Sequence, residues 1–192
     1  MVSLSTPAFV PPTRPWTLDD LAHLPDDGHR YEIIDGSLLV APPPSPQHQL
    51  GAARLSTVLR AAAPGDVDVV EATGVQVGGC VLVPDLLAVR TPALLRACRV
   101  LDRADVLLTV EVVSPSSVTT DRVTKPALLA DAGVPAYWRV ELSGPGSPLV
   151  VVHRLDGGTY RREQVVRAGE TARVDWPFTV RLSPADLTGL RR

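Results

Sequence analysis

The sequence has little cysteine, no excess of basic residues and no long apolar segment. Two cysteines, Cys80 and Cys98, are too few for a disulfide framework, and the four scattered histidines do not supply a zinc site with them. We expect both to be buried, reduced thiols. No apolar run approaches the ~20 residues that span a bilayer, and the N-terminus has no secretory pattern. We therefore expect a cytoplasmic protein that does not contact membranes.

Lysine is nearly absent as well. Lys125 is the only lysine among 19 basic residues, and the net charge of −2 gives no global attraction to nucleic acid. A coding bias towards arginine explains the ratio, and the survival of one lysine by chance is then the simplest reading. Arginine cannot, however, replace lysine where a compact ammonium must lie beside a reacting atom. Lys125 is therefore a candidate functional residue.

The residues that are present indicate one globular domain of mixed α/β type. Hydrophobic residues make up 45% of the chain and charged residues 21%, which is typical of a folded domain of this size. We expect a loose, proline-containing arm over residues 1–15 and a single domain over residues 16–192.

Hydrophobic periodicity and turn residues place the elements. We expect helices over 17–22, 47–63, 126–132 and 183–187, a hairpin over 30–40 that turns at Asp35-Gly36, strands over 67–70, 75–77, 81–89, 106–113, 136–142 and 149–155, and edge strands over 160–166 and 172–174. The segment 94–101 fits either a short helix or an irregular excursion.

Two carboxyl groups stand out within apolar predicted strands. Asp85 interrupts the segment 81–89, and Glu111 interrupts the segment 106–113. A buried carboxylate costs several kcal/mol unless it is paired, hydrogen-bonded or bound to a metal. On neighbouring strands the two acids would suit Mg²⁺ or Mn²⁺, because a hard divalent ion binds one or two carboxylates and keeps its other positions for water or phosphate. The alternative is that arginines or backbone N–H groups pair with them for structural reasons.

Lys125 follows Glu111 on the segment that leads to the next predicted helix. From there its ammonium could reach the same point and stabilise developing negative charge. A metal site of this kind can polarise a phosphodiester and generate hydroxide. The sequence contains no Gly-x-Ser-x-Gly elbow and no phosphate-binding Gly-x-x-x-x-Gly-Lys loop, which disfavours a serine hydrolase and a nucleotide hydrolase.

These residues occur in an order that resembles a known family. The chain carries Arg30-Tyr31-Glu32-Ile33-Ile34-Asp35-Gly36, a proline-rich lead into Gln47-His48-Gln49, Pro84-Asp85, Glu111-Val112-Val113-Ser114-Pro115-Ser116-Ser117, Asp121, Lys125 and Gly133-Val134-Pro135-Ala136-Tyr137-Trp138. This series resembles the Uma family of restriction-type endonucleases, in the PD-(D/E)XK nuclease superfamily, over roughly residues 16–190.

The resemblance implies a restriction-endonuclease-like core: a helix, a three-strand meander, a helix and a further strand, with a mixed central sheet flanked by helices. The N-terminal helix and hairpin would be an extension of this core. The implied activity is metal-dependent hydrolysis of DNA phosphodiester bonds. Its implied cofactor is Mg²⁺ or Mn²⁺ without an organic cofactor, and its implied partners are DNA and a second copy in a homodimer.

The resemblance also implies roles for individual residues. Asp85 and Glu111 match the metal-binding acids, and the carbonyl of Val112 would be a third ligand. The lysine of the superfamily motif stands two residues after the second acid, where this chain has Val113. The resemblance implies that in the Uma family this lysine lies on the following helix, where it corresponds to Lys125.

The chain departs from the family pattern in two further places. Pro126 follows Lys125 directly and disfavours helical geometry at the lysine, so we expect Lys125 at the mouth of its helix. The helix over 47–63 contains no acid, although the superfamily carries one in its first helix. Glu32 is a candidate for that place, as is His48 or Gln49 acting through water. An ordinary hydrogen-bonded histidine at a helix start is the alternative for His48.

Three functions remain open from the sequence. The first is a metal-dependent endonuclease in which Asp85, Glu111, Lys125, Glu32 and His48 form the catalytic site. The second is a catalytically weakened relative that binds nucleic acid or a protein, and the third is a structural domain that keeps only the fold. Metal binding would separate the third from the first two, and turnover would separate the first from the second.

Overall fold

The computed structural model describes residues 11–97 and 99–189. Its helices are α1 (Leu18–Leu21), α2 (Pro46–Ala62), α3 (Thr91–Arg96), α4 (Lys125–Asp131) and α5 (Ala185–Thr188), with a 3-10 turn η1 (Arg103–Asp105) and a π-helical turn η2 (Thr120–Thr124). Its strands are β1 (Arg30–Ile34), β2 (Ser37–Ala41), β3 (Val67–Glu71), β4 (Gly74–Val77), β5 (Cys80–Leu82), β6 (Leu86–Arg90), β7 (Val100–Asp102), β8 (Val106–Val112), β9 (Ala136–Glu141), β10 (Leu149–Asp156), β11 (Thr159–Arg167), β12 (Ala172–Val174) and β13 (Val180–Leu182).

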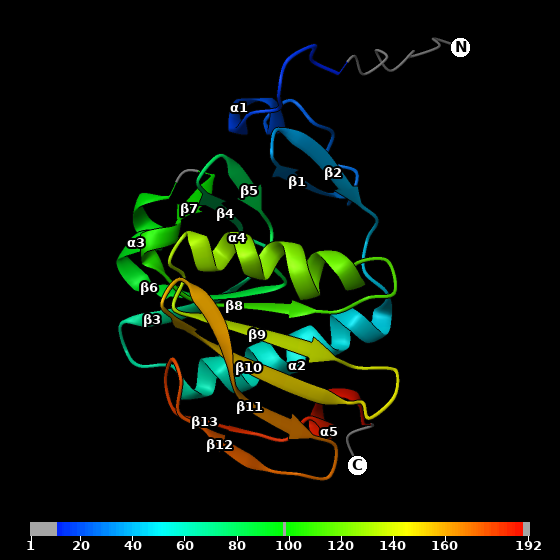
Figure 1. Cartoon of the computed structure of the whole chain (residues 1–192), viewed down its shortest axis with the longest axis vertical. Helices are drawn as coiled ribbons and strands as arrows, with labels where there is room; N and C mark the ends of the chain where they lie inside the picture. Colours follow the sequence, from blue (N-terminus) through cyan, green and yellow to red (C-terminus); the bar gives the residue numbers. More distant parts are fainter. Residues whose placement is uncertain (1–10, 98, 190–192) are drawn as a thin grey trace, which may run out of the picture.

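A six-stranded mixed sheet lies at the centre, in the order β11-β10-β9-β8-β6-β3. Its strands pair antiparallel except β8 and β9, which are parallel and are joined through α4. Helix α4 lies on one face of the sheet and α2 on the other (Figure 1). Helix α2, the meander β3–β6–β8, α4 and β9 form the core that the resemblance implies, and the mixed α/β fold class is confirmed.

The alternation of β8 decides which side Glu111 faces. Leu108, Val110 and Val112 pack in the cluster that contains Leu55 and Leu59 of α2. Glu111 lies between two of these residues, so its side chain leaves the strand on the opposite face. That is the face covered by α4, whose Leu129 belongs to the second core cluster. A strand buried on both faces therefore directs its one acid towards α4.

A second sheet has the order β2-β1-β5-β4-β7 and carries the N-terminal hairpin. The predicted turn is present, with Asp35 and Gly36 at φ values of +48° and +71°. A Cβ at Gly36 would lie 2.6 Å from Cβ of Pro15, so this turn needs glycine for both conformation and space. Arg14 pairs with Asp20 at 2.7 Å. The remainder of the predicted arm, residues 1–10, lies outside the described residues.

The prediction of one strand over 81–89 is wrong. β5 ends at Leu82 and belongs to the smaller sheet, whereas β6 begins at Leu86 and belongs to the central sheet. Pro84 has no N–H for a strand ladder, which favours a break at this point. Asp85 therefore precedes β6 where the chain crosses between the sheets.

Other expectations are resolved as follows. The ambiguous segment 94–101 contains the end of α3 and the start of β7. Cys80 is a buried free thiol, as expected, and Cys98 lies outside the described residues. Within the described part of the chain, no helix has both the length and the apolar character needed to cross a membrane.

The packing of α4 on the sheet should contribute strongly to the free energy of unfolding of the protein. Leu129→Ala removes a fully buried side chain on the face that also carries Lys125, and it should lower the free energy of unfolding by about 2–5 kcal/mol. Leu95→Ala is the matched control, because Leu95 on α3 is 88% exposed and should change the free energy by less than ~0.5 kcal/mol. Urea unfolding followed by circular dichroism measures both, and equal effects would contradict this packing.

Candidate active site

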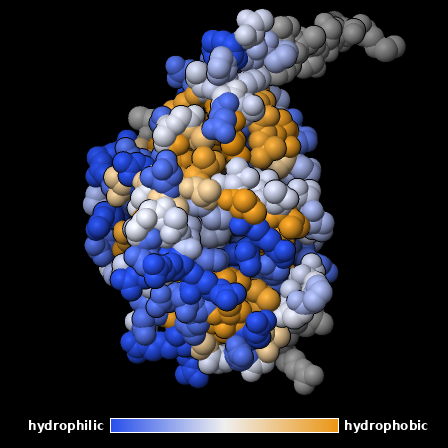
Figure 2. Space-filling view, viewed as in Figure 1, coloured by the Kyte–Doolittle hydropathy of each residue, from blue (hydrophilic) through white to orange (hydrophobic). Residues whose placement is uncertain are grey.

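A hollow of about 340 Å³ brings together the residues that the sequence predicts as a site. It is lined by Glu32 of β1, His48 of α2, Asp85, Glu111 and Val112 of β8, and Lys125 of α4, with Arg30 and Asp121. Its outer wall is apolar, because Leu39 and Val40 of β2 and the prolines 42–44 line the same hollow. In Figure 2 apolar surface gathers in the upper part of the view, over the hairpin β1–β2 and β5. The acids themselves are almost fully covered, with Asp85 4% and Glu111 1% exposed.

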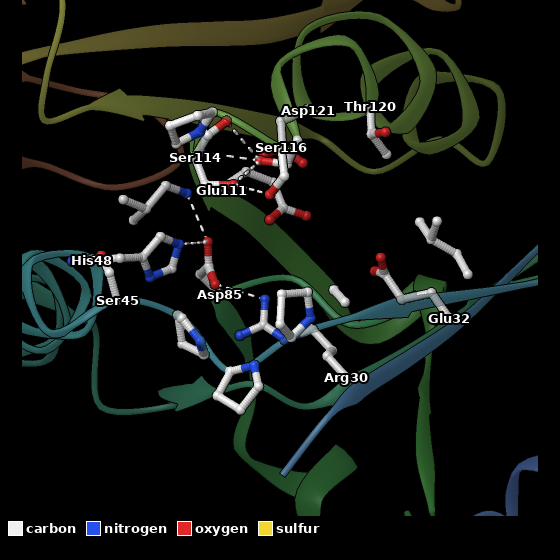
Figure 3. A pocket seen from close by; sticks show the side chains of 18 of the residues that line it. Arg30, Glu32, Ser45, His48, Asp85, Glu111, Ser114, Ser116, Thr120 and Asp121 are labelled. Carbon is white, nitrogen blue, oxygen red and sulfur yellow. Dashed lines mark hydrogen bonds and ion pairs between the residues drawn. The ribbon is translucent and has the colours of Figure 1, made fainter.

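Asp85 is held by three donors from three different elements. Its Oδ1 accepts from Nη1 of Arg30 at 2.7 Å, and its Oδ2 accepts from the backbone N–H of Val112 at 2.7 Å. Nε2 of His48 lies 3.2 Å from the same Oδ2, and Figure 3 shows the carboxylate between His48 and Arg30. Burial alone would raise the pKa of Asp85, but the hydrogen bond from His48 and the charge of Arg30 lower it. Asp85 is therefore ionised at neutral pH.

Lys125 lies among three carboxyl groups. Its Nζ is 2.9 Å from Oε1 of Glu111, 2.9 Å from Oε1 of Glu32 and 3.8 Å from Oδ1 of Asp121. Burial opposes the charge of Lys125, but the three acids outweigh it and raise the pKa above its ordinary value. Burial, with the charges of Asp85, Asp121 and Glu32, raises the pKa of Glu111 well above its ordinary value, against the pull of Lys125. One ammonium is thus shared among more negative charge than it can balance.

Lys125 lies at the mouth of α4, as expected, because it is the first residue of that helix. The expectation that Pro126 keeps the backbone of Lys125 out of helical geometry is wrong. Its φ and ψ are −61° and −46°, and its N–H donates to the carbonyl of Thr120, five residues earlier. A proline in a regular helix clashes with the carbonyl four residues before it, whereas a π turn widens the backbone at that point. The turn η2 therefore lets Pro126 follow a helical Lys125, with Lys125 as the first residue of α4.

Glu32 and His48 both have direct partners in the site. Glu32 accepts a hydrogen bond from the N–H of Val83 at 2.6 Å, so it also fixes the crossing between the sheets. His48 lies in the first turn of α2, where Ser45 caps its N–H at 3.3 Å. Its Nδ1 is buried and has no hydrogen-bond partner among the described residues. The other candidate for the helix position, Gln49, is exposed.

Sequence reasoning gave no role in the site to two of its residues. Asp121 and Arg30 both belong to the family series, but neither has a stated role in the site. Asp121 precedes Lys125 by four residues, the spacing at which oppositely charged residues meet on a helix, and this was the available signal. No local pattern predicts that Arg30 pairs with Asp85, because the two residues are 55 positions apart in sequence.

A family model described as "Putative restriction endonuclease", named Uma2, matches residues 18–185. This match spans most of the chain. The protein belongs to the Uma2 family. A solved structure from Anabaena variabilis ATCC 29413, titled as a "putative nuclease belonging to DUF820", is similar in fold with a TM-score of 0.68. It is 20% identical, and the similarity covers 91% of this chain and 98% of that one. No curated protein matches the sequence.

The donor set of this Uma2 site fits a hard divalent cation in chemistry and charge. Four carboxyl groups line the hollow against two permanent cations, Arg30 and Lys125, which leaves two negative charges when all the acids are ionised. Asp85 and Glu111 supply carboxylate oxygens, and Val112 lies beside them. Among the described residues no three Asp, Glu, His or Cys side chains converge as metal ligands. Mg²⁺ needs only one or two protein carboxylates, so two acids are a sufficient set.

The ion cluster yields a stability prediction. Lys125→Met leaves Glu111 and Glu32 buried without their cation and should lower the free energy of unfolding by about 3–5 kcal/mol at pH 7. The double variant Lys125→Met/Glu111→Gln should recover part of this loss, because it removes one of the uncompensated charges. Arg161→Met is the control, since the Arg161–Asp156 pair is exposed and contributes at most ~1 kcal/mol. If the double variant loses as much free energy of unfolding as the two single substitutions added together, measured by urea unfolding, the cluster is contradicted.

Proposed function

We propose that this Uma2 protein hydrolyses DNA phosphodiester bonds as a metal-dependent endonuclease. The observation that carries the proposal is the placement of the only lysine, whose Nζ lies 2.9 Å from Glu111 in the hollow that Asp85 also lines. Asp85, Glu111 and the carbonyl of Val112 would hold Mg²⁺ or Mn²⁺. A homodimer, in which each copy cuts one strand, is part of the same proposal.

The residues of the chain divide the work. Arg30, His48 and the N–H of Val112 fix the carboxylate of Asp85 in one orientation, so its oxygens are presented without rearrangement. The ammonium of Lys125, beside Glu111, stabilises the charge that develops on the phosphate oxygens or orients the attacking water. When bound, the divalent ion supplies Lewis acidity and lowers the pKa of water. Glu32 holds the other side of the ammonium and keeps it over the sheet.

A second candidate function is a module that binds nucleic acid or protein without turnover. It is favoured by the partners that Asp85 and Glu111 already have within the protein. The two functions predict different outcomes in the same experiment.

Nicking of supercoiled plasmid tests both candidates. The wild type should nick DNA with Mn²⁺ or Mg²⁺ and not with EDTA, and Asp85→Asn and Lys125→Met should each lower the rate about 100-fold or more. Asp68→Asn is the matched control, because Asp68 is an exposed acid on β3 of the same sheet, and it should keep the wild-type rate. Equal nicking by all variants would show that the site is not responsible. A folded wild type that binds plasmid, linear or single-stranded DNA without cutting it would establish the second candidate.

Metal binding can be measured without turnover. Mn²⁺ at 100 times its dissociation constant should stabilise the wild type by about 2.7 kcal/mol, seen as a rise in Tm that EDTA abolishes. Asp85→Asn should lose most of this rise, whereas Asp68→Asn should retain it. An identical rise in both variants would mean that Mn²⁺ binds elsewhere.

A further inference from the structure

The turn that carries Asp121 and Lys125 contains a defect in its backbone hydrogen bonding. In η2 the N–H of Lys125 donates to the carbonyl of Thr120, which is the five-residue spacing of a π helix. At the same spacing, the donor for the carbonyl of Asp121 would be residue 126. That residue is Pro126, which has no N–H. The carbonyl of Asp121 is therefore left without this donor at a buried position.

A tyrosine hydroxyl from the central sheet fills that place. The hydroxyl of Tyr137 on β9 donates to the carbonyl of Asp121. Tyr137 pairs with Thr109 of β8, which lies two residues before Glu111 and on the same face of the strand. Tyr137 therefore points to the same face as Glu111, and it is 1% exposed. Burial and the charges of Glu111 and Asp121 raise its pKa well above the ordinary value, so the hydroxyl keeps the proton that it donates. The same strand system thus holds both Glu111 and the turn that presents Lys125 to it.

We propose that Tyr137 is a positioning residue of the candidate active site, and that its hydroxyl holds the π turn in the register that places Lys125 against Glu111 and Glu32. The proposal rests on the proposed function only for its effect on catalysis. A backbone carbonyl with no donor in a buried site carries a desolvation cost that the turn can reduce by changing its hydrogen bonds. A change from five-residue to four-residue spacing would rotate Lys125 about the helix axis, because the two helix types differ in residues per turn.

A second tyrosine gives a matched control. Tyr160 of β11 stacks on Tyr137 with ring centroids 5.7 Å apart, and its hydroxyl donates to the carbonyl of Val134 at 2.8 Å. Tyr137 is buried and Tyr160 is half-buried, and both hydroxyls donate to a backbone carbonyl. Only the hydroxyl of Tyr137 acts on the turn with Asp121 and Lys125. Tyr160→Phe therefore reproduces the chemical change and the loss of a hydrogen bond without touching η2.

Lys125 is its own spectroscopic probe, because it is the only lysine in the chain. Protein labelled with ¹³C-lysine gives one Cε resonance in the NMR spectrum. Tyr137→Phe should shift or split this resonance, and Tyr160→Phe should leave it at the wild-type position. Urea unfolding confirms that each variant is folded under the conditions of the spectrum. An unchanged resonance in Tyr137→Phe, or the same change in both variants, would overturn the proposal.

Catalysis and rescue complete the test. In the plasmid assay Tyr137→Phe should lower kcat about 10- to 100-fold with KM within about twofold, because the contact positions a group that acts on the transition state. Pro126→Ala returns an N–H at position 126, so Tyr137→Phe/Pro126→Ala should regain part of the lost rate and move the lysine resonance back. No recovery in either measurement would refute the role of the Asp121 carbonyl. If the wild type does not cleave DNA, the proposed function fails and the resonance alone decides the role of Tyr137.

Discussion

One buried ammonium connects the parts of this protein that form the site. Nζ of Lys125 lies within ion-pair distance of Glu32 from the smaller sheet, Glu111 from the central sheet and Asp121 from the turn before α4. Without it, three buried carboxyl groups would face one another with no cation between them. The smaller sheet, the central sheet and α4 are thus held in one arrangement by a charge that none of them could bury alone.

The two acids nearest the proposed chemistry are balanced in opposite ways. Arg30 and His48 lower the pKa of Asp85, whereas burial and neighbouring acids raise the pKa of Glu111. Because its pKa is raised in the folded state, Glu111 contributes stability that is fully present below its unfolded pKa. This stability is lost as the pH rises through its folded pKa. A further cation near Glu111 would favour the ionised form of this acid, whereas Asp85 is already a carboxylate. This asymmetry supports the proposed cation site.

The sequence could predict the elements and acids whose signals are local. Helix α2 has clear hydrophobic periodicity, β8 and β9 are short and largely apolar segments, and Glu111 is visible as a charge within an apolar strand. Lys125 was visible because no other lysine exists. The π turn was not predictable, because its polar segment has no period and its stability depends on Tyr137 from a distant strand. The break at Pro84 was missed because apolar residues on both sides belong to different sheets, and a one-dimensional pattern does not distinguish one buried strand from two.

The position of the lysine has a geometric explanation. A lysine two residues after Glu111 would, by strand alternation, lie on the same face of the sheet as that acid. Here that position is Val113, whose N–H still pairs with the carbonyl of Val140 on β9. Helix α4 covers this face of the sheet. A lysine in the first turn of α4 therefore reaches Glu111 from the covering helix and not from the same strand. The helix can supply the ammonium only if its first turn is fixed over the sheet. The turn η2 and its contact with β9 provide this fixation. A lysine on the helix thus has a position that depends on tertiary contacts, whereas a lysine on the strand would be fixed by the strand ladder.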